Sequence, residues 1–322
     1  MTHLTYLEAA VVGLIQGVTE MFPVSSLGHN VLIPALIGGS WAKDLNVAAA
    51  ESPYLAFIVG LHVATAIALL IYFWRDWVRI VRGFFSSLRD RQVATDDQKL
   101  AWMIILATIP VGIVGLGFEH AFRVIFGKPV FAAVFLAVNG LILLAGERFR
   151  TRASLTADAA VAREPALVAA GGHPAGPHVE RRQEEAAALS ADRRLATMSY
   201  RQAVVIGSSQ ILALLAGISR DGVAMVAGMR RGLSREDAAR FAFLLATPVI
   251  LAAGALKIPD LLGPLGSGIR GQILVGSVLS GVGAYLSVRF LLRYLRTRTL
   301  TPFGIYCLVA GLASVAYLGL HG

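Results

Sequence analysis

The chain has 322 residues, of which 56% are hydrophobic and 15% are charged, and its mean hydropathy is +0.67. These values exclude a typical water-soluble globular protein and a disordered chain, and they predict an integral membrane protein. The net charge of +9 would suggest nucleic-acid binding in a soluble protein, but here we assign it to membrane topology and expect no nucleic-acid partner. The single cysteine, Cys307, excludes an internal disulfide and a cysteine-rich metal site.

Two apolar regions, residues 7–40 and 202–233, are interrupted by polar residues, glycines and prolines, so neither predicts an ordinary span. Six further apolar stretches are uncharged; five of them can cross a hydrocarbon core about 30 Å thick as a helix, and residues 241–256 form a shorter sixth, so six crossings are expected. In chain order they are residues 53–74, 100–118, 129–146, 241–256, 271–288 and 299–320. Because no Lys or Arg precedes Lys43, we expect no positively charged leader and no secretory signal.

Most of the 29 Lys and Arg residues lie in four segments, namely 75–99, 147–201, 228–240 and 289–298. Cytoplasmic loops of membrane proteins carry an excess of basic residues, so these segments are predicted to lie inside the cell and both termini outside. Each interrupted region must then enter and leave the membrane on one side, the first from outside and the second from the cytoplasm. We therefore expect two re-entrant helical hairpins, whose non-helical backbone is buried in protein or lines a polar cavity.

Residues 147–198 change in composition to Ala, Arg, Glu, Gly and Pro without a sustained apolar period. This composition predicts a flexible cytoplasmic linker. It separates two parts of the chain, 1–146 and 199–322, each of which has one interrupted region followed by three spans. The predicted fold class is an all-α integral membrane protein with six transmembrane helices plus two re-entrant hairpins.

The two interrupted regions share the spacing G-x2-Q-x8-S-x2-G. Its residues are Gly13, Gln16, Ser25 and Gly28 in the first region and Gly207, Gln210, Ser219 and Gly222 in the second. Four matches are weak alone in a chain with 33 glycines, but they fall in the two segments that the topology marks as opposite hairpins. The pattern predicts an inverted-topology repeat, in which broken helices direct their N-termini at a shared site for an anionic group.

The first hairpin carries residues that can do chemistry. Gln16 and Glu20 share a helical face. A proline then stops the helix, and Ser25 and Ser26 begin the next one as N-cap residues do. A carboxylate inside a membrane is costly, so Glu20 is a functional candidate, with a merely paired structural acid as the alternative.

The second hairpin contributes Arg220, the single arginine at its turn, between Ser219 and Asp221. Its planar guanidinium matches phosphate oxygens, and Ser219 can add a hydroxyl donor; an ion pair of Arg220 with Asp221 or Glu20 is the structural alternative. Together with His29, the two hairpins supply the parts of a phosphoryl-transfer site: charge stabilisation, a nucleophile or water activator, and a proton donor. No Walker-type Gly-Lys-Ser/Thr loop is present, so an NTPase is not expected.

Two polar residues inside the predicted spans could have purely structural roles. His62 either lines the cavity or bonds a neighbouring helix, and the sequence does not choose between these roles. Asn139 is expected to join helices rather than to bind a ligand.

At its two hairpins the sequence resembles the undecaprenyl pyrophosphate phosphatases of the bacitracin-resistance family. The first family motif is Glu or Gln-x-x-x-Glu followed by Pro-Val-Ser-Ser and a His, and it is matched by Gln16, Glu20, residues 23–26 and His29. The second, Pro-Gly-x-Ser-Arg-Ser-x-x-Thr, is matched in part by Gly217, Ser219 and Arg220. Further similarity covers residues 198–202, 232–235 and 243–246, so only the predicted linker lies outside it.

The resemblance implies six spans with re-entrant helices and removal of the terminal phosphate of a C55 isoprenyl diphosphate. The reaction would take place on the outer face of the bacterial plasma membrane and recycle the lipid carrier of cell-wall synthesis. The implied catalytic residues are Glu20, Ser25, Ser26, His29 and Arg220. The implied substrate-binding residues are Gln16, Gly217, Ser219, Arg220 and Gly222. A divalent cation, Mg²⁺ or Ca²⁺, is implied with Glu20 as a ligand, whereas the attacking group and a homodimer are left open.

The sequence departs from the second family motif at three positions, where it has Ala216, Asp221 and Ala224. Asp221 is the most consequential, because an extra carboxylate repels a diphosphate unless a metal or Arg220 neutralises it. We therefore hypothesise that Asp221 binds the metal or orients Arg220. The rival function is a transporter or flippase that binds polyprenyl phosphate without hydrolysis, since inverted repeats are typical of transporters.

Overall fold

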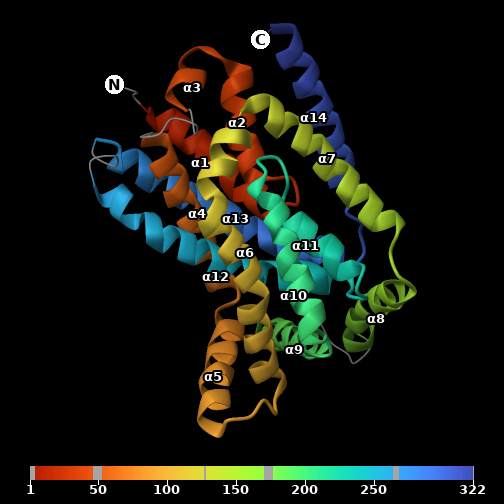
Figure 1. The fold of residues 1–322 in the computed structure, drawn as a ribbon. Helices are drawn as coiled ribbons and strands as arrows, with labels where there is room; N and C mark the ends of the chain where they lie inside the picture. The colour runs from red at the N-terminus through yellow and green to blue at the C-terminus, as the bar shows by residue number, and fades with distance from the viewer. Residues whose placement is uncertain (1–3, 46–52, 127, 170–176, 264–267, 322) are drawn as a thin grey trace.

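The computed structural model describes residues 4–45, 53–126, 128–169, 177–263 and 268–321, and every regular element in these ranges is a helix (Figure 1). Among them, five helices are long and apolar enough to cross a membrane, and a bent pair would make a sixth crossing. The five are α6 (Asp96–Phe126), α7 (Pro129–Arg148), α12 (Arg235–Leu262), α13 (Arg270–Leu295) and α14 (Thr301–His321). The bent pair is α4 (Pro53–Tyr72) and α5 (Trp74–Asp90), which meet at 84°. The chain is therefore a multi-pass helical membrane protein.

The helix that covers the fourth predicted stretch is longer than its uncharged residues suggest. The sequence places the start of this stretch at residue 241, whereas α12 begins at Arg235. Arg235 donates to both carboxylate oxygens of Glu147 at 2.7 Å, and Arg240 donates to Asp192 at 2.9 Å. Because acidic partners from other elements neutralise these arginines, the helix accommodates charges that an apolar-length criterion excludes.

Each interrupted region forms two helices separated by a break. The first consists of α1 (Tyr6–Met21) and α2 (Ser26–Ile37), followed by the short α3 (Gly39–Asp44). The second consists of α10 (Tyr200–Ser209), the 3₁₀ turn η1 (Gln210–Leu214) and α11 (Arg220–Met229). The helices α1 and α2, like α10 and α11, pack against each other, which is the arrangement of a hairpin.

The two hairpins begin in the same way. Thr5 and Glu8 form a capping box at the start of α1, and Ser199 and Gln202 form one at the start of α10. The same sequence offset that relates Gly13 to Gly207 relates these two capping boxes. The internal similarity therefore extends beyond the four positions of the G-x2-Q-x8-S-x2-G pattern.

Packing between the two halves is reciprocal. Helix α1 packs on α13, the second candidate span after the second hairpin, and α10 packs on α6, the second candidate span after the first hairpin when the bent pair α4 and α5 counts as one. A Cβ atom on Gly13 would overlap the backbone of Gly276 in α13, and one on Gly207 would overlap the backbone of Ala107 in α6. The third long helices, α7 and α14, run beside each other at one side of the bundle (Figure 1). Equivalent glycines thus permit equivalent close helix contacts.

The segment predicted to be a flexible linker contains two helices, α8 (Arg152–Ala169) and α9 (Pro177–Ala196). Both pack against α12. The Ser154 hydroxyl donates to the Leu233 carbonyl at 2.9 Å, and Leu195 is fully buried. The structure differs here from the composition-based expectation, because polar contacts together with buried apolar side chains such as Val161 and Leu195 hold these helices on the bundle.

Candidate active site

Both hairpin breaks end at a serine that caps the following helix. Ser25 Oγ accepts a hydrogen bond from the Gly28 N–H at 3.2 Å, and Ser219 Oγ accepts one from the Gly222 N–H at 3.1 Å. The positively polarised N-termini of α2 and α11 therefore lie at the two breaks. Ser25 has φ of 69°, a left-handed conformation that is uncommon for a residue other than glycine and recurs at functional sites.

The two breaks touch each other. A Cβ atom on Gly28 would lie only 2.9 Å from the Cα of Gly217, which itself has φ of 110°. Asn139 of α7 bridges the breaks, since its amide donates to the Pro23 carbonyl at 2.9 Å and accepts from the Ser219 N–H at 3.0 Å. The prediction that the hairpins meet is confirmed, and Asn139 joins helices as expected.

Glu20 is the centre of the polar cluster between the hairpins. Its Oε1 accepts a hydrogen bond of 2.7 Å from Arg220 Nη2. Its Oε2 accepts one of 2.9 Å from Gln16 Nε2 and one from the Ser26 hydroxyl. His62 Nε2 lies 3.4 Å from the same oxygen. The Glu20 side chain is only 5% exposed, so this carboxylate is held in one position by four partners.

A further amide fixes the orientation of Gln16. Asn30 of α2 donates from its Nδ2 to Gln16 Oε1 at 2.6 Å, so that oxygen is an acceptor and the Gln16 nitrogen points at Glu20. Gln16 and Asn30 are both buried. The chain from Asn30 through Gln16 to Glu20 connects the two helices of the first hairpin and orients the carboxylate.

Arg220 forms the ion pairs that the sequence offered as the structural alternative. Besides Glu20, it contacts Asp221, with Nε 3.5 Å from Oδ1. Two buried carboxylates therefore share one guanidinium, which leaves an excess of negative charge in the side chains of the cluster. A phosphate group can bind Arg220 only in competition with Glu20 or beside it.

The cluster also bears on the metal ion that the resemblance implies. Among the described residues, no three His, Cys, Asp or Glu side chains gather as a ligand set. Both oxygens of Glu20 already accept hydrogen bonds, whereas Asp221 Oδ2 is buried without a hydrogen-bond partner. Mg²⁺ is often held by one or two carboxylates together with substrate phosphates. Asp221 fits such an ion, and Glu20 fits one only after releasing a partner.

His29 lies on α2, one turn after Ser25. Its Nδ1 is 2.7 Å from the Ser25 carbonyl, and its Nε2 is 2.7 Å from the Tyr306 hydroxyl of α14. Because a carbonyl can only accept, Nδ1 carries a proton and Nε2 is the atom available for proton exchange. The rings of His29 and Tyr306 are stacked. The described contacts hold His29 through these groups rather than through Glu20 or Arg220.

The structure thus brings Glu20, Ser26, Gln16 and Arg220 into direct contact, while Ser25, Ser219, Gly217 and Gly222 shape the two helix starts beside them. His62, Asn30 and Tyr306 were not singled out as site residues by the sequence. His62 had an open role, and its contact with Glu20 decides that it belongs to the cluster. Asn30 and Tyr306 carry no local pattern that could have identified them.

The repeat is not symmetric in its chemistry. Gln210 occupies the position of Gln16, yet both of its buried amide atoms lack a hydrogen-bond partner. At the same sequence offset, Leu214 stands where the first hairpin has Glu20, and Ala224 stands where it has Asn30. The two partners of Gln16 are therefore absent around Gln210. Glu20 comes from the first hairpin, and Arg220 and Asp221 come from the second.

Comparisons with known proteins identify a family and several relatives. The family model described as "Bacitracin resistance protein BacA" matches residues 9–313. An undecaprenyl-diphosphatase from Mycolicibacterium paratuberculosis is 60% identical over 319 residues, covering 99% of each chain. Undecaprenyl-diphosphatase 2 from Frankia alni is 55% identical over 334 residues, covering 97% of each chain. Undecaprenyl-diphosphatase 2 from Burkholderia lata is 39% identical over 313 residues, covering 96% of this chain and 95% of that protein.

Proposed function

The chain belongs to the bacitracin resistance protein BacA family, and from this premise we propose that it is an undecaprenyl-diphosphatase of the bacterial plasma membrane. It hydrolyses the terminal phosphoanhydride bond of the C55 isoprenyl diphosphate and releases inorganic phosphate. The monophosphate that remains is the recycled lipid carrier of cell-wall synthesis.

The observation that carries this proposal is the contact between Glu20 and Arg220 across the two hairpins. It combines a guanidinium, a carboxylate and two helix N-termini in one buried cluster. The guanidinium and the N-termini stabilise the negative charge of the diphosphate and of the transition state. The diphosphate displaces Glu20 from Arg220, which frees the carboxylate to act as a base.

The Ser26 hydroxyl donates its hydrogen bond to Glu20, so Glu20 can take the proton from Ser26 or from a water molecule in its place. In the first case Ser26 Oγ forms a bond to the terminal phosphorus as the bond to the bridging oxygen breaks, and water then hydrolyses the phosphoserine, which releases inorganic phosphate and restores Ser26. In the second case water forms the bond to phosphorus directly. His29, with Nδ1 held by Ser25, presents Nε2 to the Tyr306 hydroxyl; we assign it to take up a proton at Nε2 from that side and to pass it to the polyprenyl monophosphate that leaves. Gln16 orients Glu20 in either route.

We assign the chain six membrane spans and two re-entrant hairpins in an inverted-topology repeat. Three features support this topology: the matching capping boxes, the equivalent glycine contacts, and the reciprocal packing of α1 on α13 and of α10 on α6. The repeats are residues 1–146 and 199–322, with both termini outside and the connecting segment in the cytoplasm. The site then faces the outer leaflet, where the substrate is presented.

A divalent cation, Mg²⁺ or Ca²⁺, supplies additional charge neutralisation when it is bound with the diphosphate. Asp221 is its proposed ligand, because Oδ2 has no other partner. Asp221 also contacts Arg220 and so limits the positions that the guanidinium can adopt.

Phosphate release from C55 diphosphate by the purified full-length protein tests the proposal, with Glu20→Ala and Arg220→Ala as inactive controls. Release by the wild type but not by the two variants is the expected result. The inverted repeat also favours a second function, a non-hydrolytic flippase for polyprenyl phosphate. Intact binding of the lipid by the wild type with no phosphate release would overturn the phosphatase and support the flippase.

A further inference from the structure

Tyr306 lies on α14 beside the first hairpin, and the reaction described above gives it no role of its own. Its hydroxyl is 2.7 Å from His29 Nε2, and the two rings are stacked with an angle of 7° between their planes. His29 Nδ1 is 2.7 Å from the Ser25 carbonyl, so this nitrogen is a donor. In the neutral ring Nε2 is then an acceptor, and the Tyr306 hydroxyl donates to it.

The Tyr306 hydroxyl stands between a buried imidazole and the surface of the bundle. His29 is 6% exposed, whereas Tyr306 is 48% exposed. Because Nδ1 faces a carbonyl, which has no proton to give, His29 exchanges protons only at Nε2. The group that lies at Nε2 is the Tyr306 hydroxyl. A hydroxyl can accept one proton while it donates another, so it can pass a proton to the ring as well as hold it.

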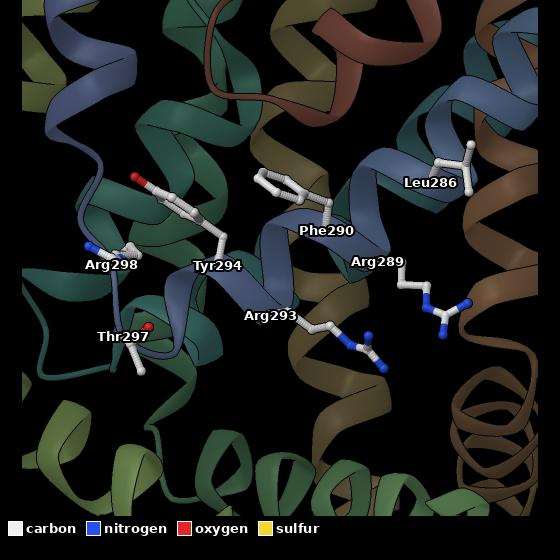
Figure 2. Close-up of a pocket in the computed structure, with 7 residues that line it drawn as sticks. All are labelled: Leu286, Arg289, Phe290, Arg293, Tyr294, Thr297 and Arg298. Carbon is white, nitrogen blue, oxygen red and sulfur yellow. The ribbon is translucent and has the colours of Figure 1, made fainter. Parts of the chain in front are cut away.

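Contacts that do not involve this hydroxyl hold α14 in place. One turn before Tyr306, the ring of Phe303 packs on those of Phe22 and Tyr294, with centroids 5.4 Å and 5.7 Å away. Figure 2 shows the Tyr294 ring extending from α13 near that of Phe290. Phe22 is the residue that ends α1, just before the break of the first hairpin. The position of the Tyr306 ring therefore depends on α14 and on stacking, and it should survive loss of the hydroxyl.

We propose that Tyr306 is a positioning residue that acts through His29 and passes it the proton for the leaving group; this role rests on the hydrolysis proposed above. The Tyr306 proton moves to His29 Nε2 while a proton from the solvent replaces it on the tyrosine oxygen. His29 then gives its Nε2 proton to the bridging oxygen, which takes the place of the tyrosine oxygen, as the bond from the bridging oxygen to the terminal phosphorus breaks. The proton that Glu20 accepts returns to the solvent, so protons balance over the cycle.

Tyr306→Phe tests the proposal, because it removes the hydroxyl and keeps the stacked ring. With purified full-length protein and C55 diphosphate, we expect kcat to fall by about 10-fold or more, less than is typical when a general acid is removed, because water can still protonate Nε2. KM and the unfolding temperature should stay close to those of the wild type. A Tyr306→Phe variant with the wild-type kcat would overturn the proposal.

A substrate analogue separates proton delivery from a purely structural role. When sulfur replaces the bridging oxygen of the C55 diphosphate, the leaving thiophosphate departs without a proton. On this analogue the ratio of the wild-type kcat to that of Tyr306→Phe is expected to fall to about one. If Tyr306 only supported the fold, the variant would be slowed equally on both substrates, and this result would overturn the proposal.

Tyr285→Phe is the matched control. Tyr285 of α13 is 36% exposed, and its ring packs on that of Tyr72 rather than on His29. The control should keep the wild-type kcat on both substrates. A loss equal to that of Tyr306→Phe would show that any tyrosine hydroxyl has this effect, which would overturn the assignment to Tyr306.

A measurement without turnover distinguishes failure of this role from failure of the proposed hydrolysis. The ¹⁵N chemical shifts of His29 in histidine-labelled protein report whether Nε2 accepts a hydrogen bond, and His29→Gln identifies the resonances. Tyr306→Phe is expected to shift the Nε2 resonance and to leave that of Nδ1 unchanged. An unchanged Nε2 resonance would overturn the bond between Tyr306 and His29. The expected shift without phosphate release by the wild type would instead overturn the hydrolysis, and the proton transfer with it.

Discussion

Arg220 donates a hydrogen bond of 2.7 Å to Glu20, although the two residues belong to different hairpins in different halves of the chain. This contact makes the candidate site a property of both halves together, since Glu20 and Ser26 come from the first hairpin and Arg220 comes from the second. It also creates a buried ion pair whose contributions to folding and to catalysis can be separated by experiment.

Replacing either member of this pair is expected to abolish phosphate release and to destabilise the protein. Glu20→Gln leaves Arg220 with Asp221 alone, and Arg220→Gln leaves two buried carboxylates without their guanidinium; we expect each change to lower the free energy of unfolding by up to about 3–5 kcal/mol. The double variant removes both charges and is expected to unfold at a higher temperature than either single variant while remaining inactive. Thermal unfolding and phosphate release in the same detergent provide the two measurements. If the double variant released phosphate, the Glu20–Arg220 pair would not be needed for catalysis and would have a structural role only.

The two adjacent serines are expected to respond differently. Ser25 caps α2, so Ser25→Ala should lower the free energy of unfolding by about 1 kcal/mol, whereas Ser25→Gly should cost only a few tenths because glycine tolerates the positive φ. Ser26 donates to Glu20, so Ser26→Ala should reduce kcat by about 100-fold or more with little change in unfolding temperature.

Ser208→Ala is a suitable control for the serine series, because this partly buried hydroxyl donates to the Val204 carbonyl away from the cluster. It should leave kcat unchanged. If the Ser26→Ala variant had the wild-type kcat, Ser26 would be excluded as the nucleophile. Activation of water by Glu20 would then be the remaining route.

The hairpins approach each other so closely at Gly28 and Gly217 that position 28 should not tolerate an added methyl group. Gly28→Ala places a Cβ atom 2.9 Å from Gly217 Cα, so backbone must move. We expect a loss of about 1–3 kcal/mol in the free energy of unfolding, as is typical of overpacking, together with a loss of activity as Glu20 and Arg220 separate.

Gly112→Ala in α6 is the matched control, since no atom lies within 4 Å of the added Cβ. This variant should keep its activity and gain slightly in stability from the better helix propensity of alanine. If Gly28→Ala unfolded at the same temperature as Gly112→Ala, the two breaks could not be in contact.

Asp221 should determine the cation dependence of the reaction. Asp221→Ser removes the carboxylate whose Oδ2 lacks a partner and relieves repulsion of the diphosphate. We expect the Mg²⁺ concentration that gives half-maximal phosphate release to change by several-fold, and we expect chelation by EDTA to inhibit the variant less than the wild type. Titration of Mg²⁺ at fixed lipid concentration measures this change, and an unaltered Mg²⁺ requirement would remove Asp221 as an ion ligand.

Helix α9 should detach when its charged anchor is removed. Asp192 accepts hydrogen bonds from Arg240 of α12 and Arg79 of α5, and its side chain is only 4% exposed. Asp192→Ala leaves two arginines without this partner, so limited proteolysis should cut residues 177–196 faster than in the wild type. Replacing the exposed Asp90 by Ala is the control and should leave the cleavage rate unchanged. Equal cleavage rates for all three proteins would mean that Asp192 does not secure α9.

Local patterns predicted much of the helical framework. Uncharged runs located the apolar helices, and the proline and serines after Glu20 located the break between α1 and α2. These features depend on neighbours within a few residues, so they can be read along the chain. The prediction was poorest between residues 147 and 198, where α8 and α9 are held by Ser154, Asp192 and similar polar contacts that periodicity does not detect.

The sequence by itself determined that this chain is a membrane protein with two interrupted regions and that Glu20 and Arg220 are charged candidates for chemistry within them. Only the tertiary structure decided that these two side chains meet, that His62 and Asn30 complete the cluster, and that Tyr306 holds His29. The reason is physical: hydropathy and capping act over one or two helical turns. Contacts between halves depend instead on how closely α1 and α13, and α10 and α6, approach at their glycines.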